Sequence, residues 1–411
     1  MGAHAGCAQK QLKRPQYEVA DIFRVHGDAY RSHHALTPEQ RKAMWAIKSC
    51  RTAVLGGHMD KCIDCHHERP SYNSCHNRHC PKCQALAAAK WLERRMERIL
   101  PVHYFHVVFT LPGELRSLGL RNRRMLYELL FRAATSTLLT LGQDPKRYQA
   151  LLGVTAVLHT WTRDLRFHPH VHCIVTGGGL SVDDAKWVDA GSDYLFPVNV
   201  MGQLFRGKFL EALAQVHDRG ELVLPPEFLA AGAFDELRGR LYRKNWVVYA
   251  KRPFAGPQQV FSYLGRYTHR VGISNHRLLD VTDEAVTIAI RDGKSATMSP
   301  EVFIGRFLQH ILPKNFVKVR HYGLAASSNV KRRLDTARHL LAERRPPPDH
   351  PDVGGEDLIG DWKSFLQHFT GIDLDVCAAC GSRRLHRRMI PPESHPVTGV
   401  SARSPPATEG A

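Results

Sequence analysis

The stretch His168-Pro169-His170-Val171-His172 is followed by Cys173-Ile174-Val175-Thr176, and these nine residues are the most informative in the chain. Branched and apolar residues dominate the second half, which predicts a buried β-strand over 171–176. Alternate residues of a strand share one face, so His170 and His172 should point together while Val171 points into the core. Two imidazoles on one strand face suit a divalent metal ion that takes a third ligand from elsewhere. A histidine-rich loop that binds no metal is the alternative.

Further strands and helices are expected on both sides of this stretch. His168 precedes Pro169, so we expect it to lie outside the strand. Additional strands are predicted at 103–110, 154–161 and 246–249, and helices at 37–54, 84–100, 114–141, 202–217, 226–243, 260–270 and 299–312. The order strand, helix, strand, strand, helix, strand favours an α+β fold with helices mainly on one face of a sheet.

Two tyrosines fall within the helix predicted at 260–270. Tyr263 and Tyr267 are four residues apart, which puts both phenols on one helix face. Such a pair taken alone is usually core packing. Here Arg266, His269 and Arg270 follow closely, and an aromatic pair among cations suits attack on a phosphate. A tyrosine that attacks a phosphodiester forms a 5′-phosphotyrosine and conserves the bond energy for religation.

Two cysteine pairs, Cys62-x2-Cys65 and Cys80-x2-Cys83, are separated by fourteen residues. This spacing is typical of a structural zinc site in which two turns complete one tetrahedron of thiolates. Free buried thiols are the alternative. The same loop offers spare ligands, which are Cys75, His66, His67 and His79. Cys377-x2-Cys380 near the C-terminus is half of such a site, to which His386 could add a ligand. A degenerate knuckle or a pair of ordinary thiols is the alternative for this motif.

The composition indicates an acidic partner. The 411 residues include 57 Lys and Arg against 39 Asp and Glu, a formal net charge of +18. This excess favours nucleic acid as a partner. No apolar stretch reaches the ~18 residues of a membrane span, and no secretory leader is recognisable. We therefore expect a cytoplasmic chain, associated with DNA and not with a membrane, whose ten cysteines bind metal or stay reduced.

The ordered motifs resemble a known family. Phe109-Thr110-Leu111, the 168–172 motif and Tyr263-x3-Tyr267 are similar to the three motifs of HUH rolling-circle endonucleases. Three further runs look like the two-tyrosine transposases of the insertion-sequence-91 family: Asn77-Arg78-His79-Cys80-Pro81-x-Cys83, Leu158-His159-Thr160-Trp161 and Tyr263-Leu264-Gly265-Arg266-Tyr267. Val319-Arg320-His321-Tyr322-Gly323 also fits this family. Several ordered motifs together are far more specific than any one.

The resemblance implies a bacterial DNA-nicking and strand-transferring enzyme with a ferredoxin-like antiparallel sheet. It implies Mg²⁺- or Mn²⁺-dependent nicking of single-stranded DNA at element ends and rolling-circle transposition. His170 and His172 would be ligands of the catalytic ion, with His269 or His159 as the third. Tyr263 and Tyr267 would be the nucleophiles, and Arg266 and Arg270 would neutralise the phosphate.

The expected organisation has five parts. They are an arm at 1–35, a zinc-binding DNA-recognition module at 36–100, the two-tyrosine nuclease domain at 101–280, a helical C-terminal extension with the last CxxC at 281–390, and a disordered tail at 391–411. Two other functions fit part of this pattern. A plasmid replication initiator or relaxase would share the chemistry, and a non-catalytic zinc protein would bind DNA without cutting it.

Overall fold

The computed structural model describes residues 15–83, 99–191, 194–254, 272–344, 373 and 375–393. The chain divides into two compact units. The terminal unit comprises Met1–Leu86, Ile273–Ile304 and His350–Ala411, and the central unit comprises Ala87–Gly272 and Gly305–Asp349. The helix predicted at 260–270 and most of the helix predicted at 84–100 lie outside the described residues.

One antiparallel sheet organises the central unit. In its described part, six strands form this sheet in the order β11-β4-β5-β3-β7, and β6 pairs with β5 off this path. The strands are β3 (Tyr104–Thr110), β4 (Ala150–Trp161), β5 (Phe167–Ser181), β6 (Trp187–Asp189), β7 (Val248–Phe254) and β11 (Val319–Gly323). Every pairing is antiparallel. The expected α+β class and antiparallel sheet are confirmed, and the strand with the histidine motif lies in the middle.

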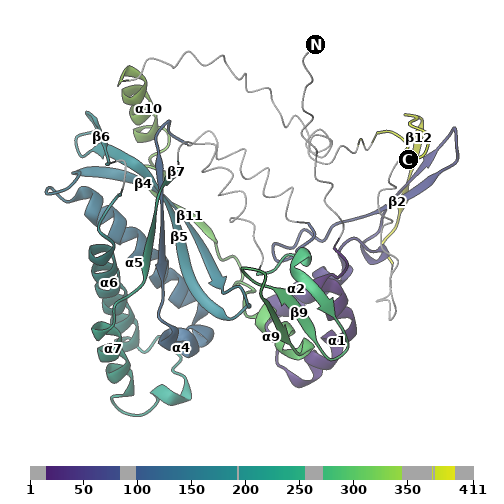
Figure 1. Cartoon of the computed structure of the whole chain (residues 1–411), viewed down its shortest axis with the longest axis horizontal. Coiled ribbons are helices and arrows are strands. Elements are labelled where there is room, and N and C mark those ends of the chain that lie inside the picture. Colours follow the sequence, from purple (N-terminus) through teal and green to yellow (C-terminus); the bar gives the residue numbers. More distant parts are fainter. Residues whose placement is uncertain are drawn as a thin grey trace. The chain divides into compact units, whose positions relative to one another are not determined.

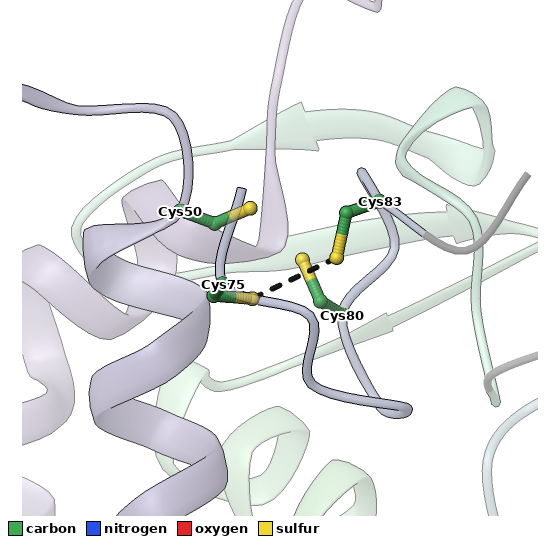
Figure 2. A group of neighbouring side chains, drawn as sticks. All are labelled: Cys50, Cys75, Cys80 and Cys83. Carbon is green, nitrogen blue, oxygen red and sulfur yellow. Dashed lines mark hydrogen bonds between the residues drawn. The ribbon is translucent and has the colours of Figure 1, made fainter. Parts of the chain in front are cut away.

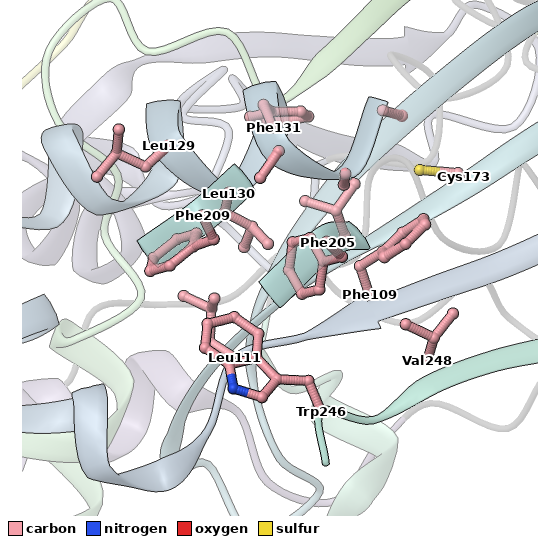
Figure 3. Packing of buried hydrophobic residues seen from close by; sticks show 14 of the residues in the cluster. Phe109, Leu111, Leu129, Leu130, Phe131, Cys173, Phe205, Phe209, Trp246 and Val248 are labelled. Carbon is pink, nitrogen blue, oxygen red and sulfur yellow. The ribbon is translucent and has the colours of Figure 1, made fainter. Parts of the chain in front are cut away.

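Helices cover one face of this sheet (Figure 1). They are α4 (Arg116–Arg121), α5 (Arg123–Gln143), α6 (Val198–Asp218) and α7 (Ala233–Arg243), with short 3₁₀ turns at Gly113–Leu115 and Pro226–Phe228. Phe109 of β3 packs against Phe205 of α6, and Phe131 of α5 belongs to the same buried cluster (Figure 3). Complete burial of each such ring contributes roughly 1.5–3 kcal/mol. This core fixes the sheet, and thereby the direction of every side chain on it.

The opposite face is divided between an apolar end and a polar end. Tyr104, Val157 and Ile174 point to this face and pack with Leu334 and Leu341 of α10 (Arg333–Arg344). Because strand side chains alternate, the same face also receives the other residues of equal parity on β3, β4 and β5. Among these residues are His106, His159, His170 and His172.

Two small sheets and two helices make up the described terminal unit. The sheets have the orders β12-β1-β2 and β10-β9-β8. Their strands are β1 (Gly57–Cys62), β2 (Glu68–Tyr72), β8 (Leu278–Val281), β9 (Val286–Ala289), β10 (Ser295–Met298) and β12 (Leu385–Ile390). The helices are α1 (Val19–His33) and α2 (Pro38–Ser49), α9 (Pro300–Leu308) begins in this unit, and 3₁₀ turns lie at Ala53–Leu55 and Asn275–Arg277. The predicted start of α2 is confirmed, since the amide of Gln40 donates to the Thr37 hydroxyl at 3.3 Å.

Several expected elements differ from the structure. The segment expected as an arm contains α1, whose Val19, Ile22 and Phe23 are buried. The C-terminal extension is not only helical, because it also contributes strands. β11 pairs with β4, and β12 pairs with β1. Each bonds to an edge that lies far away in sequence, which local patterns do not reveal. Among the described helices, none is long and apolar enough to cross a membrane.

Candidate metal centres

Three histidines from two neighbouring strands converge on the polar end of the central sheet. His159 of β4 is the direct antiparallel partner of His170 on β5, and His172 lies one pleat further along β5. One ring nitrogen from each residue lies within 4.8 Å of the others, and we call this group the histidine cluster. Ring centroids are 4.3 Å apart for His159 and His172 and 5.0 Å apart for His170 and His172. His170 and His172 therefore do share a face, and Val171 is fully buried in the core beneath them.

Of the two suggested third ligands, His159 is the one that the structure describes. His159 is 4% exposed and belongs to the histidine cluster. His269 lies outside the described residues, as do Tyr263, Tyr267, Arg266 and Arg270. His168, expected before the strand, is part of β5, because β5 begins at Phe167 and pairs there with Trp161.

The environment favours the neutral form of His170 and His172. Burial lowers the pKa of His170 to about 4 and, together with the charges of its neighbours, lowers the pKa of His172 to about 2. A neutral imidazole is the form that binds a metal ion. The Nδ1 atom of His170 lies 2.7 Å from the His168 carbonyl oxygen. A carbonyl can only accept, so Nδ1–H donates, and Nε2 keeps the lone pair that a metal requires.

A fourth histidine contacts the cluster and was not identified from the sequence. His106 of β3 is 3% exposed, and its Nε2 lies 2.9 Å from Nδ1 of His172. Burial, followed by the charge of Lys251, lowers the pKa of His106 to about 4. The sequence carries one signal for His106. His106 and Thr110 are an even number of residues apart, so they share one face of the predicted strand. In the structure β3 pairs with β5, and this face lies beside the face that bears His170 and His172.

The cysteines form two groups, not the one expected from the CxxC spacing. Cys62 and Cys65 lie with Cys377 and Cys380, which we call the terminal cysteine cluster. Cys80 and Cys83 lie with Cys50 and Cys75, which we call the inner cysteine cluster (Figure 2). The expected single tetrahedron is therefore wrong in its pairing. The spacing within a CxxC turn determines where its own two thiols point. It does not determine which other thiols complete the site.

Both clusters have the geometry of a tetrahedral thiolate site. Facing Sγ atoms are 3.6 Å apart for Cys62 and Cys380 and 3.7 Å apart for Cys75 and Cys83. Zn–S bonds of about 2.3 Å put tetrahedral sulfurs roughly 3.8 Å apart, whereas a disulfide bond is only about 2.05 Å long. The backbone amides of Ala379 and Cys380 lower the pKa of the Cys377 thiol to about 6, which favours the thiolate that zinc binds.

Of the other residues that the sequence suggested as zinc ligands, Cys75 joins a cysteine cluster and the histidines do not. Cys75 belongs to the inner cysteine cluster, and Cys50, at the end of α2, is a member that the spacing did not indicate. In the described parts of the chain, no histidine joins either cysteine cluster. The two cysteine clusters therefore do not include His66, His67, His79 or His386.

Comparisons with known proteins match both regions. A family profile described as "Transposase zinc-binding domain" matches residues 22–111, and one described as "Putative transposase" matches residues 153–333. A protein of Sinorhizobium fredii (strain NBRC 101917 / NGR234) named "Putative transposase y4qJ" is 44% identical over 90% of this chain and 94% of its own length. The "Transposase for insertion sequence element IS801" of Pseudomonas savastanoi pv. phaseolicola is 28% identical over 83% of this chain and 82% of its own length. No solved structure matches.

Proposed function

This chain belongs to the insertion-sequence-91-like family of transposases, and we propose that it nicks single-stranded DNA at element ends through a 5′-phosphotyrosine intermediate. Membership of the family implies that DNA is bound, and the zinc-binding domain together with the cysteine clusters supports structural Zn²⁺. The observation that carries the proposal is the histidine cluster on adjacent strands of one antiparallel sheet.

Three convergent imidazoles, of which His159 is buried and His170 and His172 have strongly lowered pKa values, fit a divalent ion. His159, His170 and His172 would hold it. Nitrogen ligands suit transition metals better than Mg²⁺, so of Mg²⁺ and Mn²⁺ we expect Mn²⁺ to bind more tightly. When bound, such an ion acts as a Lewis acid and template for the scissile phosphate. We also propose that the central sheet is the catalytic sheet of an HUH endonuclease.

The nucleophile in the proposed reaction is a tyrosine. The phenolic oxygen of Tyr263 or Tyr267 attacks the phosphorus, the bond from phosphorus to the 3′ oxygen breaks, and the released strand ends in a 3′-hydroxyl. The DNA stays attached as a 5′-phosphotyrosine, and attack by a 3′-hydroxyl reverses the step. With two tyrosines, one can hold a DNA end while the other attacks a second phosphate, as rolling-circle strand transfer requires. Arg266 and Arg270 would neutralise the phosphate.

Cations near the histidine cluster support a phosphate ligand. Lys318 and Lys251 are close enough for their charges to lower the pKa of His172. Lys318 precedes β11, and its Nζ lies 5.1 Å from the ring centroid of Trp161 at the end of β4. Lysines beside a metal-binding face bind a DNA backbone electrostatically.

The test uses labelled single-stranded DNA that carries a candidate element end, and it measures label migrating with protein on a denaturing gel. Mn²⁺ is added to one sample and divalent ions are omitted from the other, without a chelator, because a chelator would also remove zinc. We expect a covalent product only with Mn²⁺, lost in His170→Gln and in His172→Gln but kept in His168→Gln, which lies on the same strand outside the cluster. DNA binding without a covalent product from wild-type protein would favour the non-catalytic zinc protein.

A further inference from the structure

We propose that Cys62, Cys65, Cys377 and Cys380 bind a second structural zinc ion, separate from that of the inner cysteine cluster, which fastens the C-terminal strand β12 to β1. The matched zinc-binding domain covers residues 22–111 and so contains only half of these ligands. The other half comes from more than 300 residues further along the chain, after all the strands of the central sheet in sequence order.

The two halves of the terminal cysteine cluster have the same backbone geometry. In the first, the amide of Cys62 donates to the carbonyl of His67 at 2.9 Å, and the amide of His66 donates to the carbonyl of Cys62 at 3.1 Å. In the second, Cys377 donates to Ser382 at 2.7 Å, and Gly381 donates to Cys377 at 2.9 Å. The residue after the second cysteine is left-handed in both turns, with φ of 59° at His66 and 72° at Gly381. The cluster is thus a pair of matched metal-binding turns.

The matched turns face one another with all four sulfurs together. The Sγ atoms of Cys62 and Cys380, and those of Cys65 and Cys377, are each 3.6 Å apart. The amide of Ala379 also lies 3.4 Å from the Cys377 sulfur. Amide-to-sulfur hydrogen bonds of this kind stabilise a thiolate, and four thiolates at such distances repel one another unless a cation lies between them.

The contacts around the terminal cysteine cluster position its two turns. β12 pairs with β1 from Gly57 opposite Ile390 to Cys62 opposite Leu385. Arg387 forms a two-point ion pair with the buried Asp60, at 2.6 and 3.1 Å, and Arg384 contacts Asp64 at 2.7 Å. The pair of Arg384 with Asp64 is exposed, and an exposed ion pair adds little stability. A structural zinc ion that bridges the two turns contributes directly to folding stability and would add far more than one exposed ion pair.

The first measurement is the zinc content of the purified full-length protein. We expect two zinc ions per chain in the wild type, one from each cysteine cluster. Cys377→Ser combined with Cys380→Ser should reduce the content to one, and so should Cys62→Ser combined with Cys65→Ser. The zinc that remains shows that the inner cysteine cluster is still folded. Cys173→Ala is the control, because Cys173 is buried in the central unit outside both clusters and its change should leave two ions.

The second measurement asks whether the zinc fastens the C-terminal strand. A protease recognition sequence is inserted at 346–349, the chain is cut there, and the fragments are separated by gel filtration. The C-terminal fragment should stay with the rest of the wild-type protein and be released from the Cys377→Ser, Cys380→Ser variant. One zinc ion per wild-type chain, two in this variant, or equal retention of the fragment in both proteins would overturn the proposal.

Discussion

His106 illustrates how a single residue can decide which atom of a neighbour is available to a metal. Its Nε2 is 2.9 Å from Nδ1 of His172. A neutral imidazole has one N–H, so His172 can offer Nε2 to a metal only if its Nδ1–H donates to His106. His106 is then the acceptor that fixes the ring of His172. It acts as a positioning residue, because it acts through His172.

The replacement His106→Leu removes this acceptor. We expect Mn²⁺ affinity to fall roughly 10–100-fold, as is usual when the partner of a ligating histidine is lost. His106→Gln, which keeps an acceptor oxygen, should recover part of the affinity. The measurement is Mn²⁺ binding by electron paramagnetic resonance in the absence of DNA, with His321→Leu on β11 as the control, since His321 bonds to Thr155 away from the cluster. Equal affinities in wild type and His106→Leu would rule out the positioning role.

His310 is a buried histidine with a structural role. Its Nε2–H donates to the Leu165 carbonyl at 3.0 Å, and its Nδ1 accepts from the Thr160 hydroxyl at 3.1 Å. Burial lowers the pKa of His310 to about 4, well below its usual range. The unfolded chain therefore takes up a proton near pH 6.5 while the folded chain does not, so folding stability falls as the pH falls through this window.

The replacement His310→Gln should make unfolding less sensitive to acid. Between about pH 7 and about pH 5, the wild type should lose roughly 2 kcal/mol more of its unfolding free energy than the variant does. Urea unfolding at several pH values measures this difference. His217→Gln, which alters a partly exposed histidine on α6, is measured in parallel as a second histidine replacement. An identical slope in His310→Gln and wild type would refute the assignment.

Among the structural elements, β11 depends on a glycine at its end. Gly323 has φ of 59°, and a Cβ at this position would collide with the carbonyl oxygen of Leu152 on β4. The amide of Leu324 donates to this same oxygen at 3.1 Å. The glycine therefore allows the chain to leave the sheet while it remains bonded to β4.

The replacement Gly323→Ala should destabilise the protein more than Gly220→Ala does. Gly220 also has positive φ, at 68°, but a Cβ there meets nothing within 4 Å. We expect a cost of about 1 kcal/mol at Gly220, from backbone conformation alone, and a larger cost at Gly323, where backbone atoms must also shift. Chemical unfolding of both variants tests this. Equal losses would mean that the contact with Leu152 relaxes freely.

Elements with local sequence signals could be predicted, whereas strands whose partners are distant in sequence could not. β5 follows from the branched run at 171–176, and the start of α2 follows from Thr37 and Pro38, because both signals are local. β11 and β12 are short, contain polar and charged residues and pair with strands that are distant in sequence. A strand whose partner lies far away in sequence carries little local signal.

For the molecule as a whole, the sequence predicts which kinds of residue bind metal. It predicts less well which of these residues come together in one site. Cys62-x2-Cys65 predicts a metal-binding turn, but only the fold shows that it meets Cys377 and Cys380. His170 and His172 were predicted because they share a strand, whereas His159 depended on how β4 pairs with β5. The expected domain boundaries remain a prediction, although the two units divide the chain differently from those linear segments.

The central claim is that a tyrosine of this chain becomes covalently attached to DNA. The most direct measurement incubates the protein with Mn²⁺ and single-stranded DNA carrying an element end, digests the product, and identifies by mass spectrometry the peptide that bears the nucleotide. We expect the nucleotide on Tyr263 or Tyr267, less product in Tyr263→Phe and in Tyr267→Phe, and none in the double variant. Full attachment by the double variant, or attachment at another residue, would contradict the account.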